Sequence, residues 1–302
     1  MAKKKRSPLS KLFVSLLLIL GVGGVGILEI GEKYADFIPF YQQGRAWFYF
    51  TKDRLLKTPD RPILITSYAD AENSPYDNLK LGVPAMADVV IDRHGYALGY
   101  SERYEQPLWV TYRITAEEVR NKSEKRTDDF RVDPYISTGS AQQEDYRKSG
   151  FDRGHLAPAA DLAWSPRSMS ESFYFSNMSP QTPDFNRGIW RELESKVRDW
   201  ALAKGELQVV TGPIFVGTPQ FIGQNRVAVP QAYYKVLYAP KTKEPAMIGF
   251  ILPNRDAGDR DLSSFAVSVN RISAATGLYF FSVMDQNLRL KLVNKLNLSE
   301  WK

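Results

Sequence analysis

Residues 151–198 constrain this chain more than any other stretch of the sequence. They contain His155, one of only two histidines in 302 residues, within the tetrapeptide Asp152-Arg153-Gly154-His155. Further along, a turn-rich segment leads into a predicted helix that begins near Asn186. Four residues of that helix recur at every fourth position: Asn186, Trp190, Glu194 and Arg198. Successive members of such a series drift by only ~40° around a helix, so the sequence predicts one shared flank.

The same helix carries a second series of apolar residues, also at every fourth position: Ile189, Leu193, Val197 and Ala201. These side chains are expected to pack against a sheet. Their burial would hold the polar flank at the edge of the core, where an imidazole, an amide, a carboxylate and two guanidinium groups converge. That preorganisation suits catalysis.

The converging groups suit phosphodiester hydrolysis beside a hard cation. His155, with an ordinary pKa of ~6.5, can accept a proton from water, although a buried histidine that only orients a turn is the alternative. The amide oxygen of Asn186 is a hard donor for Mg²⁺, and the competing interpretation is that Asn186 or Asp184 caps the helix. Zinc is disfavoured, because the chain has two distant histidines and no cysteine.

The remaining polar residues fit the same chemistry. Glu194 is expected to reach the ion through a water molecule, or else to pair with Arg198 one turn away. Arg153 and Arg198 are expected to stabilise negative charge on the phosphate, which planar guanidinium donors do well.

A spaced set of residues resembles a known signature. Leu156 and Ala160 follow the Asp-Arg-Gly-His word, and Asn177 precedes Asn186 by nine residues, with Glu194 and Arg198 beyond. This set resembles the DNA/RNA non-specific endonucleases, a family that includes secreted bacterial nucleases and mitochondrial endonuclease G. Weaker similarity extends over residues 76–283.

The resemblance implies a ββα-metal core and an enzyme that depends on Mg²⁺, with Mn²⁺ as an alternative ion. It implies contact with DNA and RNA through the phosphate backbone, cleavage with little sequence preference, and 5′-phosphate products. By resemblance, Asn177 holds the His155 region in place, and an upstream arginine binds the substrate phosphate. Arg126 and Arg131 are both candidates for that arginine. The alternative is a catalytically silent nucleic-acid-binding or uptake protein on the same fold, and the sequence leaves a homodimer and an inhibitor protein open.

The N-terminus has a different composition. Residues 1–11 are basic and residues 12–28 carry no charge, which predicts a transmembrane signal anchor over 12–30, with a cleaved signal peptide as the alternative. A connector over 31–60 and a nuclease domain over 61–302 would follow, with the catalytic domain outside the cytoplasm, in the periplasm or the extracellular space. Residues 1–30 supply +4 of the net charge of +6, so global charge does not itself indicate a nucleic-acid partner.

Short apolar runs predict the secondary structure. The expected strands are 87–91, 96–100, 108–113, 207–211, 232–238 and 246–252, with another strand or hairpin within 220–229 and a last strand or buried edge over 277–284. Helices are expected over 115–122, capped by Thr115 and Glu118, and over 265–275, ending at Gly277. His94 is expected in a hairpin turn. Because strict βαβ alternation is missing, the predicted class is α+β, with a mixed, mostly antiparallel sheet flanked by helices.

Overall fold

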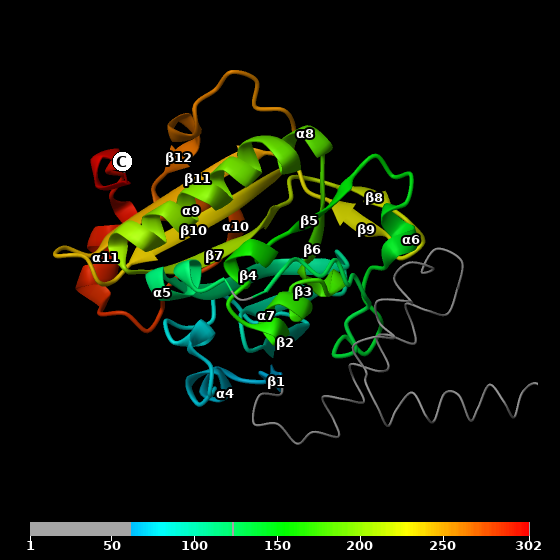
Figure 1. Ribbon diagram of the computed structural model, residues 1–302, viewed down its shortest axis with the longest axis horizontal. Helices are drawn as coiled ribbons and strands as arrows, with labels where there is room; N and C mark the ends of the chain where they lie inside the picture. The colour runs from blue at the N-terminus through cyan, green and yellow to red at the C-terminus, as the bar shows by residue number, and fades with distance from the viewer. Residues whose placement is uncertain (1–61, 123, 302) are drawn as a thin grey trace, which may run out of the picture.

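The computed structural model describes residues 62–122 and 124–301, and its centre is an eight-stranded sheet (Figure 1). Every pairing between neighbouring strands of this sheet is antiparallel. In spatial order the strands are β1 (Ile63–Leu64), β2 (Val89–Asp92), β3 (Ala97–Ser101), β4 (Gln106–Thr115), β7 (Glu206–Ile214), β10 (Ala232–Ala239), β11 (Ala246–Pro253) and β12 (Ala266–Val267).

Two small strand pairs and a set of helices complete the described residues. β5 (Asp152–His155) pairs with β6 (Met178–Gln181), and β8 (Gln220–Ile222) pairs with β9 (Val227–Val229). The α-helices are α4 (Tyr68–Glu72), α5 (Ala116–Arg120), α6 (Gln143–Tyr146), α7 (Pro166–Glu171), α8 (Pro183–Phe185), α9 (Arg191–Lys204), α10 (Val269–Thr276) and α11 (Gln286–Asn294). The shorter turns are η2 (Asp77–Leu79), η3 (Ala159–Asp161), η4 (Phe175–Asn177), the π-helical η5 (Asn186–Trp190), η6 (Leu262–Phe265) and η7 (Leu298–Trp301).

The alternation of side chains along β10 separates two core layers. Tyr233 and Leu237 pack in the layer beneath α9, where Leu193 and Val197 are completely buried. Tyr234, between them, points into the opposite layer, which α10 and α11 cover. Figure 1 shows α9 lying along one side of β10 and β11, with the β5–β6 pair beside its α8 end.

Several expectations from the sequence are confirmed. The class is α+β, and Ile189, Leu193, Val197 and Ala201 are all buried. Thr115 and Glu118 form a reciprocal capping box at the start of α5, and His94 lies in the turn between β2 and β3.

Two expectations are wrong. Residues 277–284 form turns and not a strand, because Gly277 and Phe281 take left-handed backbone conformations with φ of 74° and 59°. Leu278, Phe280 and Phe281 pack in the layer under the sheet, as the buried-edge alternative predicts, while Tyr279 and Val283 are exposed. The C-terminal helix α10 begins at Val269 and not at residue 265, because η6 and β12 occupy the residues before it.

The predicted anchor at 12–30, with its basic flank at 1–11 and the connector at 31–60, lies outside the described residues. Within the part of the chain that the structure describes, no helix has the length and apolar character needed to cross a membrane.

Candidate functional site

The β5–β6 pair places two of the predicted residues on one side of a strand. Because side chains alternate along β5, Arg153 and His155 share a face and Gly154 faces the other way. A Cβ atom on Gly154 would lie 2.2 Å from the side chain of Gln181 on β6, so the close approach of the two strands requires glycine here. Arg153 and His155 therefore project together into a cleft of about 220 Å³.

The segment after β5 is held by one buried amide. The Oδ1 atom of Asn177 accepts a hydrogen bond from the Ala157 amide at 2.9 Å, and its Nδ2 donates to the carbonyl oxygens of Ala157 and Ser172, each at 2.9 Å. Asn177 is completely buried and does not line the cleft. It acts on the site by positioning the backbone that follows His155.

Replacing Asn177 with alanine is expected to destabilise the fold by about 3–5 kcal/mol, because three buried backbone groups lose their partners. Urea unfolding measures this change. Asn73→Ala is the matched control, since Asn73 is an exposed amide that makes one bond, to the Ala69 carbonyl. An Asn177→Ala variant as stable as the control would contradict the positioning role.

The imidazole of His155 sits among aromatic rings. Its centroid lies 5.8 Å from that of Phe130 and 5.0 Å from that of Phe173, both in edge-to-face orientation. Burial, followed by the positive charges of Arg126 and Arg153, lowers the pKa of His155 to about 3. Nε2 is buried and has no hydrogen-bond partner among the described residues. His155 is therefore a neutral imidazole whose Nε2 no other described side chain engages.

This lowered pKa predicts a pH-dependent stability. Between pH ~6.5 and ~3 the unfolded chain binds a proton at His155 that the folded chain excludes, so stability is present above pH 6.5 and is lost as the pH falls. In EDTA, the wild type is expected to lose about 2 kcal/mol more than a His155→Gln variant when the pH is lowered from 7.5 to 5. Urea unfolding at both pH values checks this, and parallel losses in the two proteins would refute it.

The helix that carries the second half of the site is interrupted. It begins at Pro183, after Thr182, and Gly188 (φ −98°, ψ −114°) breaks it within η5 before α9 starts. The helical segment thus begins three residues before the predicted start near Asn186, which is the first residue of the π-helical turn η5. The helix-cap alternative is wrong for Asn186, which already has helical φ and ψ of −60° and −44°, and for Asp184, which lies inside α8 after the N-cap residue Thr182.

The interruption also changes which residues share a flank. Trp190 is 1% exposed and packs against Phe185 and Tyr233, with ring centroids 5.4 and 5.6 Å away, so its predicted place on the polar flank is wrong. The wide turn at Gly188 lies between Asn186 and Trp190, so the spacing of four residues across it does not preserve the face, whereas Trp190 and Glu194 both follow the break and stay one turn apart. Asn186 and Glu194 nevertheless both line the cleft with His155.

Asp152 orients the amide of Asn186. The Nδ2 atom of Asn186 donates to Asp152 Oδ2 at 2.9 Å, and Arg187 bonds both carboxylate oxygens at 2.8 and 2.7 Å. Burial raises the pKa of Asp152, but the hydrogen bonds from Arg187 and Asn186 outweigh it and leave that pKa below its usual value. The Oδ1 atom of Asn186 accepts no hydrogen bond within the described ranges, so it remains available to a cation.

The oxygen donors of the cleft fit a hard cation with few protein ligands. Glu194 lines the cleft beside Asn186, and burial raises the pKa of its carboxyl group against the lowering effect of Lys235. Between residues 62 and 301, excluding residue 123, no group of three or more histidine, aspartate or glutamate side chains is placed to hold a metal. An amide oxygen with a nearby carboxylate is a donor set suited to Mg²⁺, which keeps most of its water ligands.

Arg198 has a partner other than the one considered from the sequence. Its Nη1 lies 2.9 Å from Asp161 Oδ1, and the other oxygen of Asp161 accepts the Tyr112 hydroxyl at 2.9 Å. The structure describes no ion pair between Glu194 and Arg198. Arg198 is not among the residues that line the cleft.

The structure distinguishes the two upstream arginines. Arg126 has a side chain that is 52% exposed, lines the cleft, and lies over the Phe173 ring at 4.9 Å. Arg131 is buried, and its Nη1 lies 2.7 Å from Asp129 Oδ2. Arg126 is therefore in place to meet a phosphate, and the burial of Arg131 does not fit a substrate contact.

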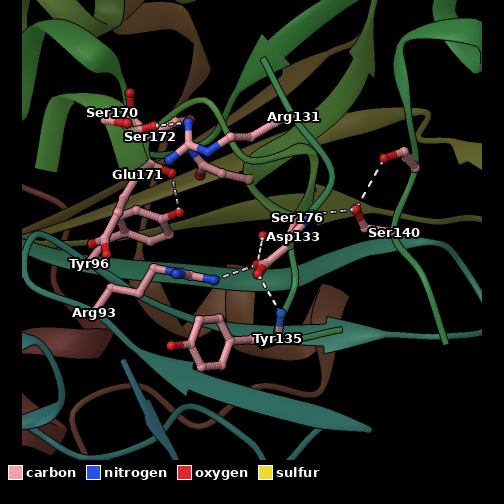
Figure 2. Close-up of polar contacts among 12 residues, drawn as sticks. Arg93, Tyr96, Arg131, Asp133, Tyr135, Ser140, Ser170, Glu171, Ser172 and Ser176 are labelled. Carbon is pink, nitrogen blue, oxygen red and sulfur yellow. Dashed lines mark hydrogen bonds and ion pairs between the residues drawn. The ribbon is translucent and has the colours of Figure 1, made fainter. Parts of the chain in front are cut away.

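A buried network holds the loop of Arg126 against the rest of the site (Figure 2). Arg93, in the turn after β2, lies 2.5 Å from Asp133, which also accepts hydrogen bonds from the Ser176 hydroxyl and the Tyr135 amide. The guanidinium groups of Arg93 and Arg131 lie 4.5 and 3.9 Å from the centroid of the Tyr174 ring. These contacts join the sheet, the 126–135 loop and η4, which carries Asn177.

Sequence reasoning missed two further arginines of the cleft, Arg187 and Arg191. Each follows a residue of the four-residue polar series, and that adjacency is the signal that could have identified them. A neighbouring depression of about 320 Å³ shares Arg126, Arg153 and Asn186 with the cleft and adds Arg147. The cationic surface around His155 is thus wider than the sequence analysis predicted.

Comparisons with known proteins show the family to which the chain belongs. Residues 74–287 match the family model described as DNA/RNA non-specific endonuclease. Human "Endonuclease G, mitochondrial" is 35% identical over 214 residues, covering 67% of this chain and 72% of that protein. "Nuclease 1, mitochondrial" of Schizosaccharomyces pombe (strain 972 / ATCC 24843) is 34% identical over 306 residues, covering 91% and 93% of the two chains.

Among solved structures, the chain is similar to one described as "Crystal structure of the EndoG/EndoGI complex: Mechanism of EndoG inhibition". The match has a TM-score of 0.66 and 32% identity, and it covers 70% of this chain and 93% of that one. The two chains are therefore similar in sequence as well as in fold.

Proposed function

Because the chain belongs to the DNA/RNA non-specific endonuclease family, we propose that this nuclease hydrolyses DNA and RNA at one cation-dependent site, with little sequence preference. The observation that carries the proposal is the convergence of His155, Asn186, Glu194 and Arg126 on one cleft. A neutral imidazole, oxygen donors for a cation and guanidinium groups for a phosphate are the parts that phosphodiester hydrolysis requires.

His155 is the general base of the proposed reaction. Its Nε2 accepts a proton from the water that attacks phosphorus, the bond from phosphorus to the 3′ oxygen breaks, and that oxygen takes a proton from solvent, which leaves a 5′-phosphate and a 3′-hydroxyl. Arg126 and Arg153 bind the phosphate and balance the negative charge that grows on its oxygens. Asp152 fixes the amide of Asn186 through the hydrogen bond to Nδ2.

Asn186 Oδ1 would hold Mg²⁺ or Mn²⁺ directly, with Glu194 reaching the ion through a water molecule. When bound, the cation neutralises charge on the scissile phosphate and on the leaving oxygen. Arg198 would help to hold α9, which carries Glu194, in position through its ion pair with Asp161.

The neighbouring depression extends the proposed substrate path. It shares Arg126 and Arg153 with the cleft, so one nucleic-acid strand can contact both hollows through consecutive phosphates. Contacts of this kind give affinity without sequence information, which fits a non-specific enzyme. Arg147 would bind a phosphate next to the scissile one.

The test is digestion of supercoiled plasmid and of a structured RNA by the purified full-length protein. Cleavage of both substrates in Mg²⁺ or Mn²⁺ and none in EDTA is expected, with phosphatase-sensitive 5′ ends. The alternative, a catalytically silent nucleic-acid-binding or uptake protein, predicts a shifted band without cleavage under every cation condition.

Partners and location belong to the same proposal. EndoG in the similar solved structure is bound to EndoGI, and we propose that an inhibitor protein would cover the His155 cleft here too. Anchoring through residues 12–30, a catalytic body outside the cytoplasm and a homodimer remain predictions. Two of the similar proteins are named as mitochondrial.

A further inference from the structure

Lys235 is a charged residue in the middle of an apolar strand. It is the only charged residue of β10, whose sequence is AYYKVLYA, and it is paired with Thr211 on β7 and with Phe250 on β11. Alternation along the strand puts Lys235 on the same face as Tyr233 and Leu237, towards α9. Its side chain is completely buried.

The ammonium group of Lys235 lacks the partners that a buried charge normally has. Its Nζ donates no hydrogen bond to any described residue and lies 4.5 Å from the centroid of the Trp190 ring. An ammonium removed from water costs several kcal/mol unless an opposite charge compensates it. The aromatic face supplies part of that compensation.

Four charged groups lie around α9 next to the cleft: Arg198 and Asp161 form an ion pair, whereas Glu194 and Lys235 interact by charge without a contact short enough for an ion pair. The ion pair is 2.9 Å long, and Tyr112 bonds the second oxygen of Asp161. Among the neighbouring charges, Lys235 has the largest effect on the pKa of Glu194, and Glu194 has the largest effect on the pKa of Lys235. Glu194 follows Trp190 by four residues, which places it close to the ring that covers Lys235.

We infer that Lys235 is a positioning residue of the catalytic cleft, because its buried ammonium is the counter-charge that holds the Glu194 carboxylate in place. This inference rests on the proposed function for the role of Glu194 in the reaction. Lys235 itself does not line the cleft and touches no substrate. It acts through Glu194.

The first test needs no activity. Unfolding by urea in EDTA is measured for the full-length wild type, Lys235→Met, Glu194→Gln and the double variant. Each single variant leaves one buried charge without its counter-charge, so the double variant is expected to be more stable than the two single losses predict, by at least tenfold in the unfolding equilibrium constant. If the change in the unfolding equilibrium constant of the double variant equals the product of the changes in the two single variants, the inference is overturned.

Failure to fold is also informative. If Lys235→Met does not fold and the double variant does, the loss depended on Glu194 and the inference stands. If neither folds, the loss did not depend on Glu194 and the inference falls.

The second test separates positioning from packing. Lys235→Met is expected to lower kcat for plasmid cleavage at least tenfold while KM for the plasmid changes less than about twofold, because the arginines that bind phosphate are untouched. Lys235→Arg, which keeps the charge, is expected to recover part of kcat. Leu237→Ala, two residues along the same buried face, should lower stability and leave kcat unchanged.

The two proposals fail in different ways. A wild-type protein that cleaves nothing would contradict the nuclease proposal, and the unfolding comparison in EDTA would still decide on Lys235. An active wild type whose kcat survives Lys235→Met would contradict the inference alone.

Discussion

Replacing His155 with alanine is expected to lower kcat for plasmid cleavage by ~10²–10⁴-fold, the usual contribution of a positioned general base. In the proposed reaction the imidazole accepts the proton, and burial together with Arg126 and Arg153 lowers its pKa and keeps it neutral. The arginines proposed to bind phosphate remain in the variant, so affinity for DNA should change little. Steady-state kinetics with saturating Mg²⁺ and fluorescence anisotropy in EDTA measure the two quantities separately.

The chain offers a matched control for that variant. His94 is the other histidine, and it lies in the turn after β2, where its ring centroid is 4.9 Å from that of Trp164. His94→Ala is expected to keep the wild-type kcat. Equal losses in the two variants would show that the loss reports packing, and would remove His155 from the reaction.

Asn186→Ala is expected to lower cleavage by roughly 100-fold or more at a fixed Mg²⁺ concentration, because it removes a protein oxygen proposed to hold the ion. The cation concentration needed for half-maximal activity should rise, and raising Mg²⁺ or Mn²⁺ should recover part of the rate. A full cation titration of each variant is the measurement.

A control for the amide is Asn121→Ala, since Asn121 ends α5 on the exposed surface. Its cation dependence should match that of the wild type. If Asn186→Ala keeps the wild-type cation dependence as well, its amide is not a ligand, and the bond to Asp152 would be its whole contribution.

The spacing of apolar residues predicted the burial of one helix face correctly, because Ile189, Leu193, Val197 and Ala201 keep their period wherever the helix is regular. The polar series failed at Trp190. Gly188 allows a backbone break that no count of spacings reveals, and the large indole gains more from burial in the core than from exposure on the flank.

The candidate site shows the same division. The sequence predicted that His155 and Asn186 lie together, because their residue types and spacing match a chemical task, and both line the cleft. The choice between Arg126 and Arg131 depended on which arginine forms a buried ion pair. Arg131 forms one with Asp129, two residues before it. Lys235 was missed because a single lysine in a strand indicates neither a site nor a partner. Its importance follows from the helix that packs over it.

The decisive measurement is kcat/KM for plasmid cleavage by the wild type, His155→Ala, Asn186→Ala and the variant with both changes. Residues that serve one transition state lose their effects together, so the double variant is expected to be no more than a few fold slower than the slower single variant. If the loss of kcat/KM in the double variant equals the product of the two single losses, imidazole and amide act independently. A wild-type rate in either single variant would contradict a shared catalytic cleft.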